Sequence, residues 1–132
     1  MRAVPDAVLD APRRVARAAG DLHLLVVFGS RATGQARPES DWDFAYLAGA
    51  GFDADELLAR LAETLHADRV DLVDLARAGG QLRYRVAAEG WLVYEARTGT
   101  YDRFWLDAVS FWCDVAPVIR AAYEGYLSEL SR

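Results

Sequence analysis

The sequence contains no lysine, since all fifteen of its basic residues are arginine. This absence excludes mechanisms that need a lysine Schiff base or the lysine of a P-loop. A single cysteine, Cys113, excludes an internal disulfide. Prolines are also few, four in 132 residues, whereas 53% of the residues are hydrophobic and 27% are charged. This composition is typical of a folded globular protein and not of a disordered chain.

Long hydrophobic runs are missing as well. The most apolar stretch, residues 22–28, is far shorter than the ~20 residues that span a bilayer, and the start of the sequence lacks the layout of a signal peptide. We therefore expect a cytoplasmic protein without a membrane segment. The length suits a single domain, residues 1–132. A net charge of −5 argues against direct binding of nucleic acid through its phosphates.

Strand patterns alternate with helix patterns along the chain. Apolar residues at helical spacing predict a helix over residues 4–19, in which Pro12 either causes a kink or marks the start, with Asp10 as the cap. The patterns predict strands over 22–30, 41–48, 69–75 and 91–95, helices over 53–67 and 81–90, and a helical segment over about 101–130 that kinks or restarts at Pro117. This order indicates an α/β or α+β sheet domain with a helical C-terminal end.

The most informative segment is Gly29-Ser30, followed after ten residues by Asp41-Trp42-Asp43. A glycine that closes a buried strand lets a ligand approach the backbone, and a serine at the start of the next turn adds a hydroxyl, which together suit a phosphate. Carboxylates at positions i and i+2 of a strand project from one face and can bind hard divalent cations. This combination is the equipment of metal-dependent phosphoryl or nucleotidyl transfer.

A lone Asp-x-Asp motif is expected roughly once by chance in a sequence with thirteen aspartates, but the added Gly-Ser at a fixed offset makes the pattern specific. The competing interpretation of Asp41 and Asp43 is turn chemistry and solvation of an exposed strand face. Asp53 and Asp55 form a second such motif, which we assign to the start of a helix. Asp71 supplies a third carboxylate if its strand lies beside that of Asp43, whereas residue 74 has the opposite strand parity.

The run VVFGSRATGQARPESDWDFAYL resembles the core motif of the minimal nucleotidyltransferases, small members of the DNA polymerase beta superfamily. VDLVDL is similar to the strand that carries the third carboxylate of that family, and LRYRVAAEGWLVYE resembles the helix and strand that follow it. The resemblance implies a nucleotidyltransferase-like mixed sheet flanked by helices. It also implies ATP as substrate, two magnesium ions, and transfer of a nucleoside monophosphate with loss of pyrophosphate.

The resemblance further implies roles for individual residues. Gly29 and Ser30 would hold the triphosphate, Asp41 and Asp43 would bind the metal ions, and Asp71 would bind metal and activate the acceptor hydroxyl.

Two positions depart from the pattern of the family. Trp42 stands where an aliphatic residue is usual, and we expect it to point into the core, while Thr33 stands where arginine is common. Arg31 and Arg37 lie in the loop between the two motifs, where either can reach phosphate or simply be solvated.

The C-terminal helical segment is rich in aromatic residues. A stripe on it is wide enough to serve both the core and a partner protein; its members are Phe104, Trp105, Ala108, Phe111, Trp112, Val115 and Ile119. The competing interpretation is that these aromatic residues pack against the sheet. If one of them faces outward, Trp105 or Trp112 is the best candidate.

The resemblance implies a HEPN-domain toxin as partner. The protein would then be a protein adenylyltransferase that acts as antitoxin by adding AMP to a toxin tyrosine. The alternatives are a non-catalytic antitoxin that only binds its partner, and a subunit of an antibiotic-type nucleotidyltransferase.

Overall fold

The computed structural model describes residues 6–38 and 40–131. It contains a four-stranded mixed sheet with the strand order β3-β2-β1-β4. The strands are β1 (Leu22–Phe28), β2 (Trp42–Ala48), β3 (Val70–Asp74) and β4 (Trp91–Glu95). The central strand β1 runs antiparallel to both β2 and β4, and β2 runs parallel to β3. The mixed sheet that the family resemblance implies is therefore confirmed.

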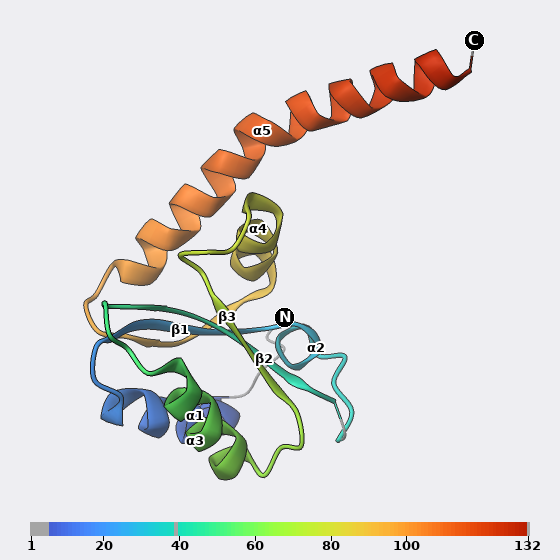
Figure 1. Ribbon diagram of the computed structural model, residues 1–132. Coiled ribbons are helices and arrows are strands. Elements are labelled where there is room, and N and C mark those ends of the chain that lie inside the picture. Colours follow the sequence, from blue (N-terminus) through green and yellow to red (C-terminus); the bar gives the residue numbers. More distant parts are fainter. Residues whose placement is uncertain (1–5, 39, 132) are drawn as a thin grey trace.

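Helices cover both faces of this sheet (Figure 1). They are α1 (Asp6–Ala18), α2 (Ser30–Thr33), α3 (Ala54–Leu65), α4 (Gly80–Glu89) and α5 (Thr100–Leu130). The helices α1 and α3 pack on one face, where Leu25, Val27 and Phe44 form a buried cluster with residues of both helices. The helices α4 and α5 cover the opposite face, against Val26 and Phe28. Every residue of β1 except His23 is buried, which explains its nearly unbroken apolar sequence.

The first helix runs through Pro12, so the alternative in which it begins there with Asp10 as its cap is wrong. The side chain of Pro12 is buried, and its packing offsets the hydrogen bond that a proline removes from the helix. The predicted first two residues of this helix lie outside the described part of the chain. At α3, the carboxylate of Asp53 accepts a hydrogen bond from the backbone N–H of Glu56 (3.0 Å), which confirms the capping role of this second aspartate motif.

The last helix continues through Pro117, so the predicted restart there does not occur. Figure 1 shows α5 changing direction near its middle and extending away from the sheet, and an internal proline is a common cause of such a bend. All described residues from position 117 onward are exposed. None of the helices in the described part of the chain has the length and apolar character needed to cross a bilayer.

Candidate active site

The predicted phosphate cradle begins where β1 ends. Gly29 follows Phe28 with φ 76° and ψ −156°, a conformation that is essentially restricted to glycine. A Cβ atom built at this position would lie 2.3 Å from Oδ2 of Asp43. The backbone of Gly29 therefore lies directly against the Asp43 carboxylate, and only glycine allows this approach.

The single turn α2 completes the cradle. The carbonyl of Gly29 accepts hydrogen bonds from the N–H groups of Ala32 and Thr33, both at 3.0 Å. The indole Nε1 of Trp91 donates to the carbonyl of Ala32 (2.9 Å) and so attaches the turn to the start of β4. The turn that begins with Ser30 is thus attached both to the end of β1 and to the start of β4.

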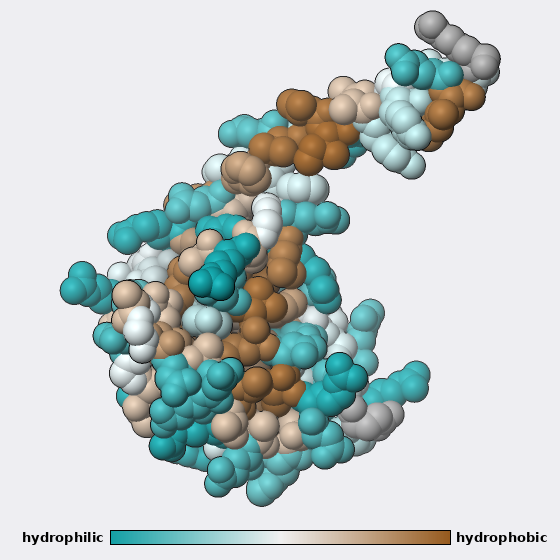
Figure 2. Space-filling view, in the orientation of Figure 1, coloured by the Kyte–Doolittle hydropathy of each residue, from teal (hydrophilic) through white to brown (hydrophobic). Residues whose placement is uncertain are grey.

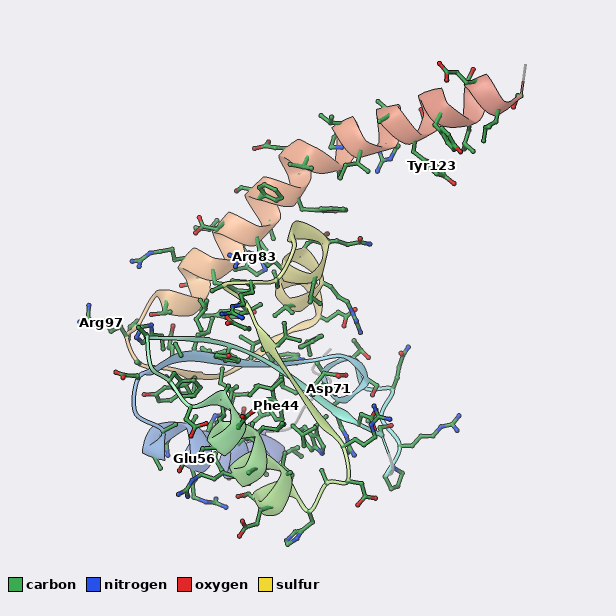
Figure 3. All side chains as sticks on the ribbon, in the orientation of Figure 1. Phe44, Glu56, Asp71, Arg83, Arg97 and Tyr123 are labelled. Atoms are coloured by element: carbon green, nitrogen blue, oxygen red, sulfur yellow. The ribbon has the colours of Figure 1, made fainter. Side chains whose placement is uncertain are left out.

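The strand register brings two of the predicted carboxylates side by side. Asp43 of β2 is the direct partner of Asp71 in the parallel pairing with β3. Because Asp43 has the same strand parity as Ala45, both carboxylates lie on the face covered by α4 and α5. Figure 3 shows Asp71 on the outer strand, and its side chain is exposed. The condition for Asp71 to supply a third carboxylate, that its strand lies beside the strand of Asp43, is therefore met.

Asp74 lies at the end of the same strand with the opposite parity, as predicted. Its Oδ1 accepts a hydrogen bond from the N–H of Ala76 (2.9 Å), and its Oδ2 lies 3.8 Å from the Nε of Arg77. Asp74 therefore closes the turn after β3 and takes no part in the carboxylate pair.

The electrostatic environment of Asp43 favours its protonated form. Burial raises the pKa of Asp43 above its ordinary value, and the neighbouring Asp71 raises it further. Arg85 lowers this pKa, and Asp41 adds a smaller increase. The carboxylates of Asp71 and Asp41 thus disfavour the negative charge on Asp43, and a cation bound between them would remove this repulsion.

The donor set fits hard divalent cations, which prefer carboxylate oxygens. Asp41 precedes β2 and shares the parity of Asp43, but its Oδ2 lies 3.6 Å from the Nε of Arg69. Among residues 6–38 and 40–131, no three acidic, histidine or cysteine side chains are already grouped closely enough to hold an ion. Asp41, Asp43 and Asp71 therefore do not form a closed three-carboxylate group in this structure.

Two residues of α4 that the sequence analysis did not identify also lie at the site. The backbone N–H of Gly29 donates to Oε1 of Glu89 (3.2 Å). Oε2 of Glu89 lies 3.3 Å from the Nε of Arg85, and the guanidinium carbon of Arg85 lies 5.4 Å from the centre of the Phe28 ring. The i,i+4 spacing of Arg85 and Glu89 was visible in the sequence, but nothing there indicated which part of the sheet their helix covers.

Arg31 stabilises the loop that joins the Gly-Ser motif to the Asp-x-Asp motif. Its guanidinium donates hydrogen bonds to the carbonyls of Pro38 (3.2 Å) and Ser40 (2.8 Å) and lies 4.7 Å from the ring centre of Trp42. Trp42 is 6% exposed, which confirms that it points into the core. The N–H of Arg37 donates to the hydroxyl of Ser40 (2.7 Å), which also shapes the loop.

The raised pKa of Asp43 predicts a pH-dependent stability difference for Asp43→Asn. Because the folded-state pKa lies above the unfolded value, ionisation of Asp43 destabilises the fold as the pH rises past 3.8, its ordinary value. We expect the asparagine variant to melt at a higher temperature than the wild type near neutral pH, and this advantage to vanish below about pH 4. Thermal melts across this pH range without added metal measure the effect, and a variant that is less stable at neutral pH would contradict it.

Comparison with known proteins identifies related sequences and structures. The family model described as "Polymerase beta, Nucleotidyltransferase" matches residues 13–98. The protein adenylyltransferase MntA of Aphanizomenon flos-aquae is 32% identical over 96 residues, which are 63% of this chain and 63% of that protein. The matched segment thus covers less than two thirds of the length of this relative.

Solved structures show the same fold. A chain in the crystal structure of a toxin–antitoxin with AMP-PNP is 27% identical, with a TM-score of 0.74 over 90% of this chain and 98% of that one. A chain in the complex of the tri-AMPylated Shewanella oneidensis HEPN toxin with MNT antitoxin is 25% identical, with a TM-score of 0.69 over 92% and 98% of the two chains. Because the family model covers more than half of the sequence, including the Gly-Ser and Asp-x-Asp motifs, this chain belongs to the polymerase beta nucleotidyltransferase family.

Proposed function

We propose that this protein transfers AMP from ATP to a hydroxyl group, that of a tyrosine, on a partner HEPN toxin, and so acts as the antitoxin. The observation that carries the proposal is the contact between the Gly29 backbone and the Asp43 carboxylate, with Asp71 as the direct neighbour of Asp43. A phosphate-binding turn against a carboxylate pair is suited to nucleotidyl transfer. The related chains named above, one an adenylyltransferase and two from toxin–antitoxin structures, support this choice of reaction and partner.

Each site residue has a proposed role in this reaction. Gly29 and Ser30 bind the triphosphate, and Asp41, Asp43 and Asp71 hold magnesium ions, which supply positive charge to the phosphates when bound. Asp71 also accepts the proton of the acceptor hydroxyl, whose oxygen forms a bond to the α-phosphorus while pyrophosphate leaves. Asp71 is exposed, so a protein acceptor has access to it. We place this reaction in the cytoplasm, where ATP is available.

The helix α5 provides a surface for the partner. Its distal half carries an apolar stripe with spacings of four, three and four residues, which lies on one helix face; its members are Ile119 (52% exposed), Tyr123 (61%), Tyr126 (60%) and Leu130 (63%). Hydrophobic residues are visible on this protruding part in Figure 2, and Figure 3 places Tyr123 far from the sheet. We assign this stripe to contact with the toxin, because the similar chains of toxin–antitoxin structures are matched over 90% and 92% of this chain.

The structure distinguishes the two tryptophans in the proximal part of α5. Trp105 is 40% exposed and is therefore the candidate that faces outward. Trp112 is instead half-buried and stacks on Tyr84 of α4, with 5.9 Å between the ring centres, in agreement with the packing interpretation. A single helix pattern did not reveal that α4 lies beside this position. The distal stripe is therefore the better place to test partner binding.

Replacing Tyr123 or Tyr126 by alanine is expected to weaken binding of the toxin by ~2 kcal/mol, or about thirtyfold, as truncation of an aromatic anchor typically does. Folding stability should change little, because both side chains are exposed on the protruding helix. Calorimetric titration and thermal melts measure the two effects. Ser128→Ala, on the opposite side of the same helix, is the control. Unchanged toxin affinity in both tyrosine variants would exclude this surface.

The transfer itself is tested by incubating the protein with labelled ATP, magnesium and the HEPN toxin. Label on a toxin tyrosine is the expected result. A stable complex that never carries label would contradict the enzymatic proposal and favour an antitoxin that acts by binding alone. Size measurement of the chain without toxin shows whether the α5 stripe instead pairs two copies of this protein.

A further inference from the structure

The backbone N–H of Gly29 is already bound to an anion of the protein itself. One oxygen of the Glu89 carboxylate accepts its hydrogen bond at 3.2 Å, and the other oxygen lies 3.3 Å from the Nε of Arg85. A backbone N–H and an arginine are the donors that commonly bind phosphate oxygens. In this structure, the N–H of Gly29 and the guanidinium of Arg85 both interact with the carboxylate of Glu89.

Arg85 is well placed to bind a phosphate. Its side chain is 53% exposed, and its guanidinium lies over the ring of Phe28, the residue directly before the cradle. It is also close enough to Asp43 to influence the charge of that carboxylate. The planar guanidinium can donate two parallel N–H hydrogen bonds to a phosphate, which makes arginine a good phosphate-binding residue.

Glu89 has room to leave this position. Together with Arg85, Tyr84 and Trp112 it lines a cavity of about 730 Å³ between α4 and α5. Its side chain is 31% exposed, and rotation about its side-chain torsions requires no movement of the helix. The repulsion between a triphosphate and the Glu89 carboxylate favours this rotation.

We infer that Glu89 is an internal competitor for the phosphate site: it holds the Gly29 N–H and Arg85 in the absence of nucleotide, and a phosphate of ATP displaces it and binds both. This inference rests on the proposed function and adds two residues to it. Arg85 is a phosphate-binding residue, and Glu89 lowers the affinity for ATP.

The test is calorimetric titration of the full chain with ATP and magnesium. Glu89→Gln retains an oxygen that can accept from Gly29 but removes the negative charge, so we expect about five- to tenfold tighter ATP binding. Arg85→Gln removes the cation, and we expect at least about tenfold weaker binding, with or without the change at Glu89. Thermal melts with increasing ATP provide a second readout, which does not depend on transfer.

A matched control is available on α3. Glu56 and Arg60 form the same i,i+4 pair, with 3.1 Å between Oε1 and Nε, on the opposite face of the sheet. Glu56→Gln and Arg60→Gln should leave the affinity for ATP unchanged.

The two proposals fail in different ways. If the wild type binds ATP and Glu89→Gln binds it with equal or lower affinity, the role of Glu89 as a competitor is wrong. The proposed function is not affected by this result. Unchanged affinity in Arg85→Gln overturns the phosphate-binding role of Arg85. If neither the wild type nor Glu89→Gln binds ATP, both the proposed function and this inference are wrong.

Discussion

Replacing Asp43 by asparagine is expected to reduce the proposed AMP transfer by at least about a hundredfold while the fold is retained. The substitution removes one charge from the carboxylate pair with little change in volume, and a metal ion in such a site contributes several kcal/mol to transition-state stabilisation. Asp41→Asn and Asp71→Asn should have effects of the same order. Rates of AMP incorporation into the toxin, measured with saturating ATP and magnesium, test this expectation.

The control for these variants is Asp74→Asn. Asp74 lies on the same strand as Asp71 but on the opposite face, and asparagine retains the oxygen that accepts from the N–H of Ala76. Its transfer rate should stay close to that of the wild type. Near-normal transfer by folded Asp43→Asn, or an equal loss in Asp74→Asn, would show that the carboxylates on the α4 side are not the catalytic group.

Replacing Gly29 by alanine is expected to lower both folding stability and transfer. The backbone conformation at φ 76° and ψ −156° is strained for any residue with a Cβ, and such strain costs about 1–3 kcal/mol. In addition, the new methyl group would lie 2.3 Å from the Asp43 carboxylate, so the two predicted parts of the site must separate. We expect a total loss of more than about 2 kcal/mol in the free energy of unfolding, measured by denaturant titration, and loss of ATP binding.

Gly51→Ala separates the two contributions to this effect. Gly51 also has a positive φ, +82°, but an added Cβ would meet no atom within 4 Å. This variant should show only the backbone cost of ~1 kcal/mol and should bind ATP normally. If Gly29→Ala behaves like Gly51→Ala in both measurements, the close approach of cradle and carboxylate has no functional importance.

The features that depend on local chemistry were predictable from the residues alone. The nearly unbroken apolar run of residues 22–28 predicted a buried strand, and β1 lies in the centre of the sheet. Strand parity separated Asp71 from Asp74, because the alternation of side chains does not depend on the rest of the fold. The helix start at Asp53 followed from the need of the first N–H groups for an acceptor.

The ends of helices around proline were less predictable. The helix α1 continues through Pro12 and α5 continues through Pro117. At each proline, the start of a new helix was one of the two alternatives that the sequence left open. A proline removes one hydrogen bond and about 3 kcal/mol of local helix stability, but burial of neighbouring side chains can outweigh this loss. At Pro12 the burial of the proline itself contributes to that balance.

Which chemical groups meet at the site depends on the packing of the strands and helices. The order β3-β2-β1-β4 places Asp43 directly beside Asp71, and the packing of α4 on the same face brings Arg85 and Glu89 to Gly29, sixty positions away from Glu89. The sequence pattern of α4 identifies a helix but not the part of the sheet that it covers. That choice depends on contacts between residues distant in the chain, whose free energies no local pattern contains.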